Sequence, residues 1–409
     1  MTRVIYTGSF RFPDGDAAAA RVLGIGKALR ASGSVLEFAG WEDAEREEDR
    51  QPNGEYRFQD FAYVSQREFR LKPLSAFKRA LGYFTAGQNT LKWLAAQDLR
   101  DVSAIISYHG GSVFLARLAF LCRRRGIRLL LDCTEWYDPD GLVGGRFGLV
   151  HLDNEFRMQF LNRLIGRGIV ISHFLERYYS ARGCRVLRVP PLIDLSEPKW
   201  QLQSRGQNDG LLRLVYAGTP GKKDLLGSAL HGLRVLVAEG HAVELHLIGP
   251  SRDVVLACVD GDARLLDALQ SSLVFHGRVP QADVPGLLAM VDFSILLRPQ
   301  KRYAQAGFST KLVESLAAGV PVLANLTGDI AAYIRDGHEG ILLTDHSAEA
   351  FVAGVRRILA LTDAQKHEMR LVARALAEQQ FDFRAFVPQL ADFLSSNLVS
   401  SDAKKAKRN

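Results

Sequence analysis

The segment 306–325, AGFSTKLVESLAAGVPVLAN, restricts the fold of this chain more than any other part of the sequence. A polar, glycine-led loop precedes apolar residues at helical spacing, which predicts a helix over the middle of the segment. Gly319 ends this helix, and Pro321 follows where no helix continues. The apolar run 320–323 then predicts a short buried strand. Loop, helix and buried strand in this order are the repeating unit of an α/β sheet, so the segment predicts an α/β fold.

The N-terminus of this predicted helix is a candidate ligand site. We expect Ser309 or Thr310 at the N-cap, where a hydroxyl accepts a hydrogen bond from a free amide. The remaining free amides and the partial positive charge of the helix end suit a phosphate or a sugar hydroxyl. Lys311 opposes the helix dipole in the first turn, and a bound anion would offset that cost. The local pattern also fits an ordinary capped helix with a solvent-facing Glu314, and both interpretations stay open.

Polar residues also follow two predicted strands in the N-terminal half. The apolar run 104–108 ends at His109, and the run 128–131 ends at the motif DCTEWY, residues 132–137. Open α/β sheets present ligand groups at the carboxyl ends of their strands. Asp132 and Glu135 are therefore candidate catalytic carboxylates. The alternative is that Asp132 caps a loop and Glu135 is solvated.

Strand and helix patterns alternate through both halves of the 409-residue chain, which is long enough for two domains of ordinary size. A polar stretch between the halves predicts a linker. The expected segments are an N-terminal domain 1–195, a linker 196–210, a second domain 211–380, a helix 381–398 and a basic tail 399–409.

Composition excludes several classes of protein. The chain is 47% hydrophobic and 24% charged, as soluble globular proteins are. It has no apolar run of about eighteen residues that would span a bilayer, and its N-terminal residues enter a strand without the apolar core of a signal peptide. The four cysteines are scattered, which argues against disulfides or a zinc site and predicts a cytoplasmic protein.

The net charge of +7 is spread along the chain. Diffuse basic charge fits solubility, attraction to an anionic membrane, or nucleic acid, but no nucleic-acid-binding module is visible. The segment 67–97 is basic and has apolar residues at helical spacing. It is either a helix that packs on the N-terminal sheet or a surface that lies on an anionic bilayer.

The segment 306–325 resembles the signature of the retaining glycosyltransferases of family 4, the glycosyl transferases group 1, which have the GT-B fold. The family pattern is Glu-Gly-Phe-Gly, four residues, then Glu-Ala-Met-Ala-x-Gly-x-Pro-Val. The same positions here read AGFS and, from Glu314 onward, ESLAAGVPV. The resemblance implies two doubly wound, Rossmann-like domains that face each other across a central crevice. It also implies that the helix 381–398 crosses back onto the N-terminal domain.

The resemblance implies a donor site in the second domain. In the family the second glutamate, here Glu314, holds the nucleotide ribose, and the first, here Ala306, usually contacts the donor sugar. A lysine that grips the donor diphosphate is present as Lys222 or Lys223. The arginine that accompanies it is replaced by Thr219.

Arg298 follows a predicted strand just before the signature and is a candidate replacement for that arginine. The full expected donor site is Gly15, Lys222, Lys223, Arg278, Val279, Arg298, Gly307, Phe308, Ser309, Thr310, Lys311, Leu312 and Glu314.

The expected catalytic residues are Asp132, Glu135 and Lys223, since similar family members carry Asp-x-x-Glu-Trp-Tyr at the position of residues 132–137. The implied function is transfer of a sugar, with retention of configuration, from a nucleotide-sugar to a glycan or lipid-linked acceptor in surface polysaccharide or glycolipid synthesis. No cofactor, no metal and no nucleic acid partner is expected. The segment 67–92 is the expected contact with an anionic membrane, on the inner face of the plasma membrane. The alternative is a non-catalytic nucleotide-sugar-binding or assembly protein, because Ala306 and Thr219 depart from the family pattern.

Overall fold

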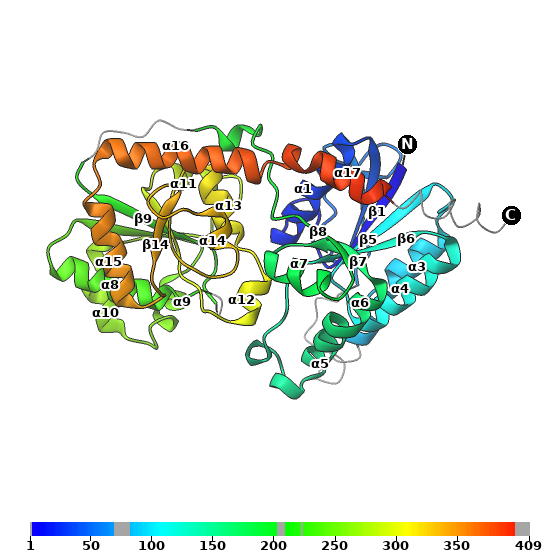
Figure 1. Cartoon of the computed structure of the whole chain (residues 1–409), viewed down its shortest axis with the longest axis horizontal. Coiled ribbons are helices and arrows are strands. Elements are labelled where there is room, and N and C mark those ends of the chain that lie inside the picture. The colour runs from blue at the N-terminus through cyan, green and yellow to red at the C-terminus, as the bar shows by residue number, and fades with distance from the viewer. Residues whose placement is uncertain (1, 69–81, 203–208, 222–223, 397–409) are drawn as a thin grey trace. The chain divides into compact units, whose positions relative to one another are not determined.

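The computed structural model describes residues 2–68, 82–202, 209–221 and 224–396 (Figure 1). The chain forms two compact units. Unit 1 combines Met1–Ile193 with Phe383–Asn409, and unit 2 is Asp194–Asp382. Each unit is built on one sheet of mostly parallel strands, as the α/β alternation of the sequence predicts.

Unit 1 contains an eight-stranded sheet in the order β3-β4-β2-β1-β5-β6-β7-β8. All neighbouring strands pair in parallel except the hairpin of β3 and β4. The order reverses between β1 and β5, so the loops after these two strands leave in opposite directions. The strands are β1 (Thr2–Gly8), β2 (Ser34–Gly40), β3 (Tyr56–Phe58), β4 (Phe61–Ser65), β5 (Val102–Tyr108), β6 (Arg128–Cys133), β7 (Arg167–Val170) and β8 (Arg185–Arg188).

Helices cover this sheet (Figure 1). They are α1 (Ala17–Ala31), α3 (Gln88–Ala96), α4 (Ser112–Arg125), α5 (Leu149–Phe156), α6 (Asn162–Ile165), α7 (His173–Ser180) and α17 (Val387–Ser395). A π-helical turn (Arg157–Leu161) joins α5 to α6, and short 3₁₀ turns lie at Glu47–Asp49, Pro139–Gly141, Gly145–Phe147 and Phe383–Phe386. The sequence predicts a helix from about residue 156, whereas the observed helix already begins at Leu149.

The first helix and the last described helix share one core in unit 1. Asp16 starts α1 as its N-cap, because its carboxylate accepts the Ala19 amide at 2.7 Å. Ile25 on α1 is fully buried and belongs to the same hydrophobic cluster as Leu390 and Phe393 of α17. The C-terminal segment therefore completes the core that the first thirty residues begin.

Unit 2 contains a six-stranded parallel sheet in the order β11-β10-β9-β12-β13-β14. This is the strand order 3-2-1-4-5-6 of a doubly wound Rossmann sheet. The strands are β9 (Leu212–Ala217), β10 (Val243–Ile248), β11 (Leu273–Gly277), β12 (Phe293–Leu296), β13 (Val322–Asn325) and β14 (Gly340–Leu343). The helices are α8 (Leu226–Ala238), α9 (Arg252–Ala257), α10 (Ala263–Ala268), α11 (Val284–Ala289), α12 (Arg302–Ala306), α13 (Thr310–Ala317), α14 (Ile330–Tyr333), α15 (Ala348–Leu359) and α16 (Asp363–Gln380), with 3₁₀ turns at Pro198–Trp200 and Gln270–Ser272.

The expected linker 196–210 begins as a packed part of unit 2. Trp200 is buried, and its carbonyl oxygen accepts a hydrogen bond from Arg374 of α16 at 2.6 Å. The same guanidinium nitrogen donates to the carbonyl of Ala317, at the end of α13, at 2.6 Å. Polar composition predicts an exposed linker here, but the aromatic side chain and this hydrogen bond hold the segment on unit 2.

None of the helices in the described ranges is long and apolar enough to cross a membrane.

Replacement of Phe351 by Ala tests the core of unit 2. The Phe351 side chain lies on α15, is fully buried and packs in the main cluster of unit 2. We expect the variant to lose about 3–5 kcal/mol of unfolding free energy, because a cavity remains after truncation. Urea unfolding of the whole chain measures this loss. Leu371→Ala, at a side chain that is 46% exposed, is the control and should change stability by about 0.5 kcal/mol or less. Equal effects of the two substitutions would contradict the assigned core.

Candidate active site

The candidate donor site in unit 2 lies where the strand order of its sheet reverses. Strands β9 and β12 are neighbours and pair in parallel, but the chain leaves them in opposite directions. Gly218 follows β9, and Arg298 comes shortly after β12. Open α/β sheets bind ligands outside the carboxyl ends of the strands at this point.

Lys311 is held at this edge by groups of its own chain. Its ammonium nitrogen lies 2.8 Å from the Tyr216 hydroxyl and 2.8 Å from a carboxylate oxygen of Asp224. The Tyr216 hydroxyl also donates to Asp224 at 2.9 Å. Burial lowers the pKa of Lys311, and Asp224 acts in the opposite direction. In the sequence, Lys311 opposes the helix dipole and no anionic partner for it can be identified. In the structure, the Asp224 carboxylate is that partner.

Gly218 makes room for this contact. Its backbone has a φ of +120°, and a Cβ atom there would lie 2.8 Å from Cε of Lys311. A side chain at position 218 would therefore strain the backbone and displace the lysine.

Glu314 lies one turn into α13 and its side chain is half-buried. Burial raises the pKa of its carboxyl group to about 7, although the charges of Lys311 and Lys199 act against this rise. Within the described part of the chain its carboxylate receives no hydrogen bond. A partly desolvated carboxylate without a donor is a favourable acceptor for ligand hydroxyl groups.

The N-terminus of α13 is also without a side-chain cap. Ser309 occupies the N-cap position, as the sequence predicts, but its hydroxyl does not bond to a first-turn amide. The helix end is therefore open to a ligand acceptor.

A small pocket adjoins this helix end. Its lining residues are Arg298, Gly307, Phe308, Ser309, Leu312, Thr327, Asp329 and Ile330. Of these, Thr327, Asp329 and Ile330 were not predicted as site residues, although they follow β13 at the same sheet edge.

Arg298 is fixed in this pocket through its backbone. Its amide donates to Asn325 at 2.8 Å, and its carbonyl accepts from Asn325 at 2.9 Å and from Thr327 at 3.1 Å. Burial is the main cause of the lowered pKa of Lys311, and the nearby guanidinium of Arg298 acts in the same direction. Burial raises the pKa of Tyr216, and the charge of Arg298 opposes that rise. Arg298 thus adds positive charge to the edge that carries Lys311.

The remaining predicted residues of unit 2 lie around this edge. Arg278 is exposed after β11, and the adjacent Val279 packs against a hydrophobic cluster of unit 2. Ala306 is fully buried at the end of α12, whereas Thr219 is exposed after β9. Lys222 and Lys223 lie outside the described residues.

In unit 1, Asp132 is buried in an ion pair. Its side chain is 0% exposed, and its carboxylate accepts hydrogen bonds from Arg21 at 2.7 and 3.0 Å. It also accepts one from the Tyr6 hydroxyl. The sequence predicts a catalytic or loop-capping carboxylate, but these partners enclose Asp132, so it has no surface for a ligand in this arrangement.

Glu135, three residues further on, is half-buried at the carboxyl edge of the unit 1 sheet. Its negative charge raises the pKa of Tyr108 and Tyr137, although burial is the larger cause for both. His109 lies at the same edge, has a φ of +54°, and its ring contacts the Thr134 hydroxyl at 2.5 Å and stacks on Tyr137. The sequence marks His109 only as a strand end, because its left-handed backbone and its contacts with Thr134 and Tyr137 are visible only in the structure.

The loop that holds Gly15 joins β1 to α1, and Gly15 itself is exposed although Phe10 and Phe12 of the same loop are buried. The Gly15 amide donates to the Arg11 carbonyl at 2.9 Å, and a Cβ atom there would lie 2.6 Å from Cβ of Arg11. This tight turn is a sufficient reason for glycine at position 15, and no ligand is needed to explain it. The contact of Gly15 with the nucleotide-sugar donor stays a prediction.

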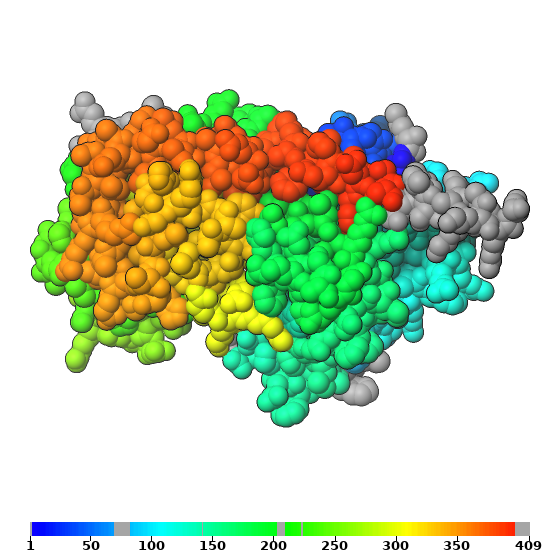
Figure 2. Space-filling model, viewed as in Figure 1, coloured from blue at the N-terminus to red at the C-terminus, as the bar shows by residue number. Residues whose placement is uncertain are grey.

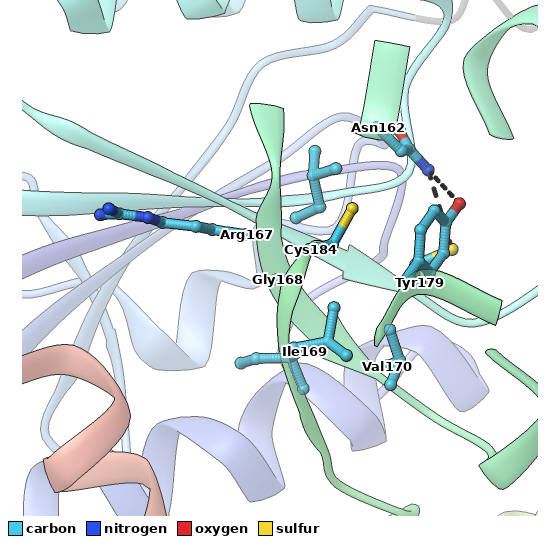
Figure 3. Close-up of a pocket in the computed structure, with 10 residues that line it drawn as sticks. Asn162, Arg167, Gly168, Ile169, Val170, Tyr179 and Cys184 are labelled. Carbon is cyan, nitrogen blue, oxygen red and sulfur yellow. Dashed lines mark hydrogen bonds between the residues drawn. The ribbon is translucent and has the colours of Figure 1, made fainter. Parts of the chain in front are cut away.

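Another pocket lies in unit 1, between β6, β7, β8 and α7 (Figure 3). Asn162 donates to the Tyr179 hydroxyl at 2.9 Å, and burial raises the pKa of the nearby Cys133 thiol to about 11. A protonated, enclosed thiol is a core group, so we assign no chemistry to this pocket.

Asp-x-Asp pairs, which often bind divalent metals, occur at positions 14/16, 138/140 and 260/262. One aspartate of each pair accepts a nearby backbone amide at the start of a helix: Asp16, Asp138 and Asp262. Among the described residues, no three His, Cys, Asp or Glu side chains cluster as a metal site would require.

Comparison with known proteins places these features in context. Residues 213–361 match the family model described as glycosyl transferases group 1. The amylovoran biosynthesis glycosyltransferase AmsK of Erwinia amylovora is 27% identical over 231 residues, which cover 55% of this chain and 54% of that protein. The match therefore spans about half the length of this relative.

Two solved structures are similar over nearly the whole chain. Sucrose-phosphate synthase of Thermosynechococcus elongatus superposes with a TM-score of 0.70 at 14% identity, covering 98% of this chain and 100% of that one. HepE of Anabaena, in complex with UDP and glucose, gives a TM-score of 0.68 at 16% identity, covering 97% and 100%. At such identities the likeness shows the fold, which is GT-B.

The raised pKa of Glu314 predicts a pH-dependent stability. Between about pH 4.5 and 7 the folded state keeps the carboxyl proton and the unfolded state loses it, so stability falls as pH rises through this range. Glu314→Gln cannot lose or gain this proton, and we expect it to be more stable than wild type by roughly 3 kcal/mol at pH 8 and equally stable near pH 4. Urea unfolding across this pH range measures the difference. A constant difference at all pH values would show that Glu314 titrates normally.

The buried ion pair of unit 1 predicts a large loss of stability in Asp132→Asn. The change leaves the Arg21 guanidinium buried without a counter-charge, which costs about 3–5 kcal/mol. Glu135→Gln, at a half-buried side chain of the same edge, is the control and should change stability by less than about 1 kcal/mol. The double variant Arg21→Met/Asp132→Leu should recover part of the loss. If Asp132→Asn unfolds like wild type, the pair does not stabilise unit 1.

Proposed function

We propose that this chain is a GT-B glycosyltransferase that moves a sugar from a nucleotide-sugar donor to a glycan or lipid-linked acceptor. The observation that carries this proposal is the Glu314 carboxylate, which has no hydrogen-bond donor in the described chain and adjoins an uncapped helix end. The donor would supply both missing partners: ribose hydroxyl groups for Glu314 and a diphosphate for the helix.

In this proposal the diphosphate is bound by positive groups at the edge of the unit 2 sheet. The first-turn amides of α13 and the guanidinium of Arg298 contact its oxygens, and the ammonium group of Lys311, which is paired with Asp224 but 16% exposed, is a further donor. Lys222 and Lys223, in the loop after β9, add further charge as the sequence predicts. The backbone at Arg278 and Val279 receives the base.

The proposed chemistry is stabilisation of the departing diphosphate. Each charge-assisted hydrogen bond contributes about 1.5–3 kcal/mol, and preorganised donors act on the charge as it develops. We propose that the acceptor hydroxyl attacks on the face from which the diphosphate leaves, so that the anomeric configuration is retained without a protein nucleophile. The new glycosidic bond forms as the bond between the sugar and the diphosphate breaks, and the departing diphosphate takes the hydroxyl proton. Glu135 orients the acceptor or the sugar. Asp132 acts indirectly, because its ion pair fixes the end of β6 from which the loop with Glu135 begins. No metal takes part in this scheme.

The proposed setting is polysaccharide or glycolipid synthesis in the cytoplasm, on the inner face of the plasma membrane. AmsK is named for amylovoran biosynthesis, and HepE has been solved with UDP and with UDP-glucose, which supports a nucleotide-sugar as donor. The membrane contact predicted for residues 67–92 falls partly outside the described residues, which omit 69–81.

A second candidate is a nucleotide-sugar-binding or assembly protein that lacks turnover. Two departures from the family pattern favour it. Ala306 is fully buried and places no carboxylate in the site, and Thr219 has no charge for the diphosphate. This candidate shares the donor site with the first and differs only in turnover.

Donor binding by wild type and Glu314→Ala tests the proposal. In a thermal-shift panel of UDP, GDP, ADP, CMP and their sugars, a ligand at about 100 times its Kd should add about 2.7 kcal/mol to stability. We expect Glu314→Ala to weaken the binding of the active nucleotide about tenfold or more, because a charge-assisted hydrogen bond is lost. Glu368→Ala, at an exposed glutamate on α16, is the matched control and should bind as wild type does.

Turnover separates the two candidates. A nucleotide that binds through Glu314 and whose sugar is also transferred or hydrolysed supports the enzyme, and the anomeric configuration of the product tests retention. Binding without any turnover supports the non-catalytic protein. If no nucleotide of the panel binds, the donor site itself is wrong.

A further inference from the structure

One helical segment of unit 1 leaves a row of large apolar side chains in solvent. The segment runs from α5 through the π-helical turn into α6. We call the exposed row the apolar stripe: Leu149 (52% exposed), Leu152 (50%), Phe156 (52%), Phe160 (59%) and Leu164 (84%). The opposite side is buried, since Asn154, Met158 and Leu161 face the core. Isolated exposed apolar residues are common, but such a row is not.

The π-helical turn keeps the apolar stripe on one face. In a regular α-helix, which has 3.6 residues per turn, side chains spaced four residues apart move gradually around the helix axis. A π-helical turn is wider, so it reverses this drift between Arg157 and Leu161. The rings of Phe156 and Phe160 consequently stack, with centroids 5.8 Å apart.

Neighbouring elements add further exposed apolar groups. Val143 and Phe147, in the loop before α5, are each 80% exposed. Helix α4 contacts both α5 and the π-helical turn, and it exposes 62% of Phe120. In Figure 2 the segment around residues 139–150 projects at the lower edge of unit 1.

The charge around the apolar stripe is strongly positive. The exposed charged residues of the segment 112–165 are Arg117, Arg123, Arg124, Arg125, Arg146, Arg163 and Asp140. The guanidinium of Arg124 lies 5.1 Å from the ring of Phe120, and that of Arg146 lies 5.6 Å from the ring of Phe147. Arginine side chains therefore stand directly beside the exposed aromatic rings.

We propose that the apolar stripe, with Phe120, Val143 and Phe147, inserts into the interfacial region of an anionic lipid bilayer. Apolar residues on one face of a helix and basic residues beside them are the two features that interfacial binding requires. A second copy of this chain would instead bring two arginine-rich surfaces together. The described part of the segment 67–92 contacts the same helix, because the Tyr83 hydroxyl donates to Asp153 of α5 at 2.6 Å.

The opposite side of the same helix holds the candidate catalytic loop of unit 1. The amide of Tyr137 donates to Asn154 at 3.2 Å, and the indole of Trp136 donates to Glu155 at 2.8 Å. Glu135 therefore extends from a loop that α5 fixes. This step rests on the proposed function. The acceptor is then a sugar carried by a membrane lipid, and insertion of the apolar stripe brings that sugar beside Glu135.

Vesicle binding by the full chain tests the inserted surface. Co-sedimentation is measured with vesicles of phosphatidylcholine alone and with vesicles in which a third of the lipid is phosphatidylglycerol. We expect wild type to bind the anionic vesicles and to release them at high salt. Phe156→Ser/Phe160→Ser should weaken binding about tenfold or more per ring, and Arg146→Gln/Arg163→Gln about fivefold per arginine. The control is Val254→Ser/Leu371→Ser, at exposed apolar side chains of unit 2.

The outcomes distinguish this proposal from the proposed function. The nucleotide thermal shift and the turnover of a water-soluble acceptor should be equal in wild type and all three variants. Unchanged vesicle binding by Phe156→Ser/Phe160→Ser overturns the assigned surface, and absence of wild-type binding overturns the membrane partner. If wild type is a dimer that does not bind vesicles, and Phe156→Ser/Phe160→Ser converts it to a monomer, the surface binds a second copy of the chain instead. Loss of vesicle binding with intact nucleotide binding supports the proposal, whatever the turnover.

Discussion

The guanidinium of Arg21 joins four separate parts of unit 1. It extends from α1 to the Asp132 carboxylate at the end of β6 and to the carbonyl of Val189, after β8, at 2.9 Å. Tyr6 of β1 donates to the same carboxylate. A buried charge is stable only when it is fully matched, so these elements can shift only together. The loop with Glu135 and Trp136 consequently starts from a fixed point.

Unit 2 repeats this arrangement with different residues. Tyr216 of β9, Asp224 and Lys311 form a second cluster of tyrosine, aspartate and cation at the carboxyl ends of parallel strands. The two clusters differ in exposure. The side chains of Arg21 and Asp132 are 3% and 0% exposed, whereas those of Lys311 and Asp224 are 16% and 17% exposed. The cluster of Arg21 and Asp132 thus has a structural role, whereas the cluster of Lys311 and Asp224 is accessible to a ligand.

Local patterns in the sequence predict much of this structure. Gly319 and Pro321 limit the helix of the signature segment, and β5 and β6 lie close to the runs 104–108 and 128–131 that predict them. Partners distant in sequence were not predictable: Asp224 lies 87 residues from Lys311, and Asp132 lies 111 residues from Arg21. The start of α5 at Leu149 was missed because the sequence carries no start signal there: Gly148 is the N-cap, no side chain caps the helix, and its first turn has no acidic residue. Thr327 and Asp329 join the pocket only because β13 ends beside β12.

The discontinuity of unit 1 has a consequence for how the protein is made. The side chains of Leu390, Phe393 and Leu394 belong to the core around α1, yet the whole of unit 2 is translated before them. At about 5–20 residues per second, the apolar face of α1 therefore waits roughly 20–70 s on the ribosome for its last partner. During that time it is a surface for chaperones or for aggregation. A messenger that ends early, before Phe383, makes a protein in which this surface is never covered.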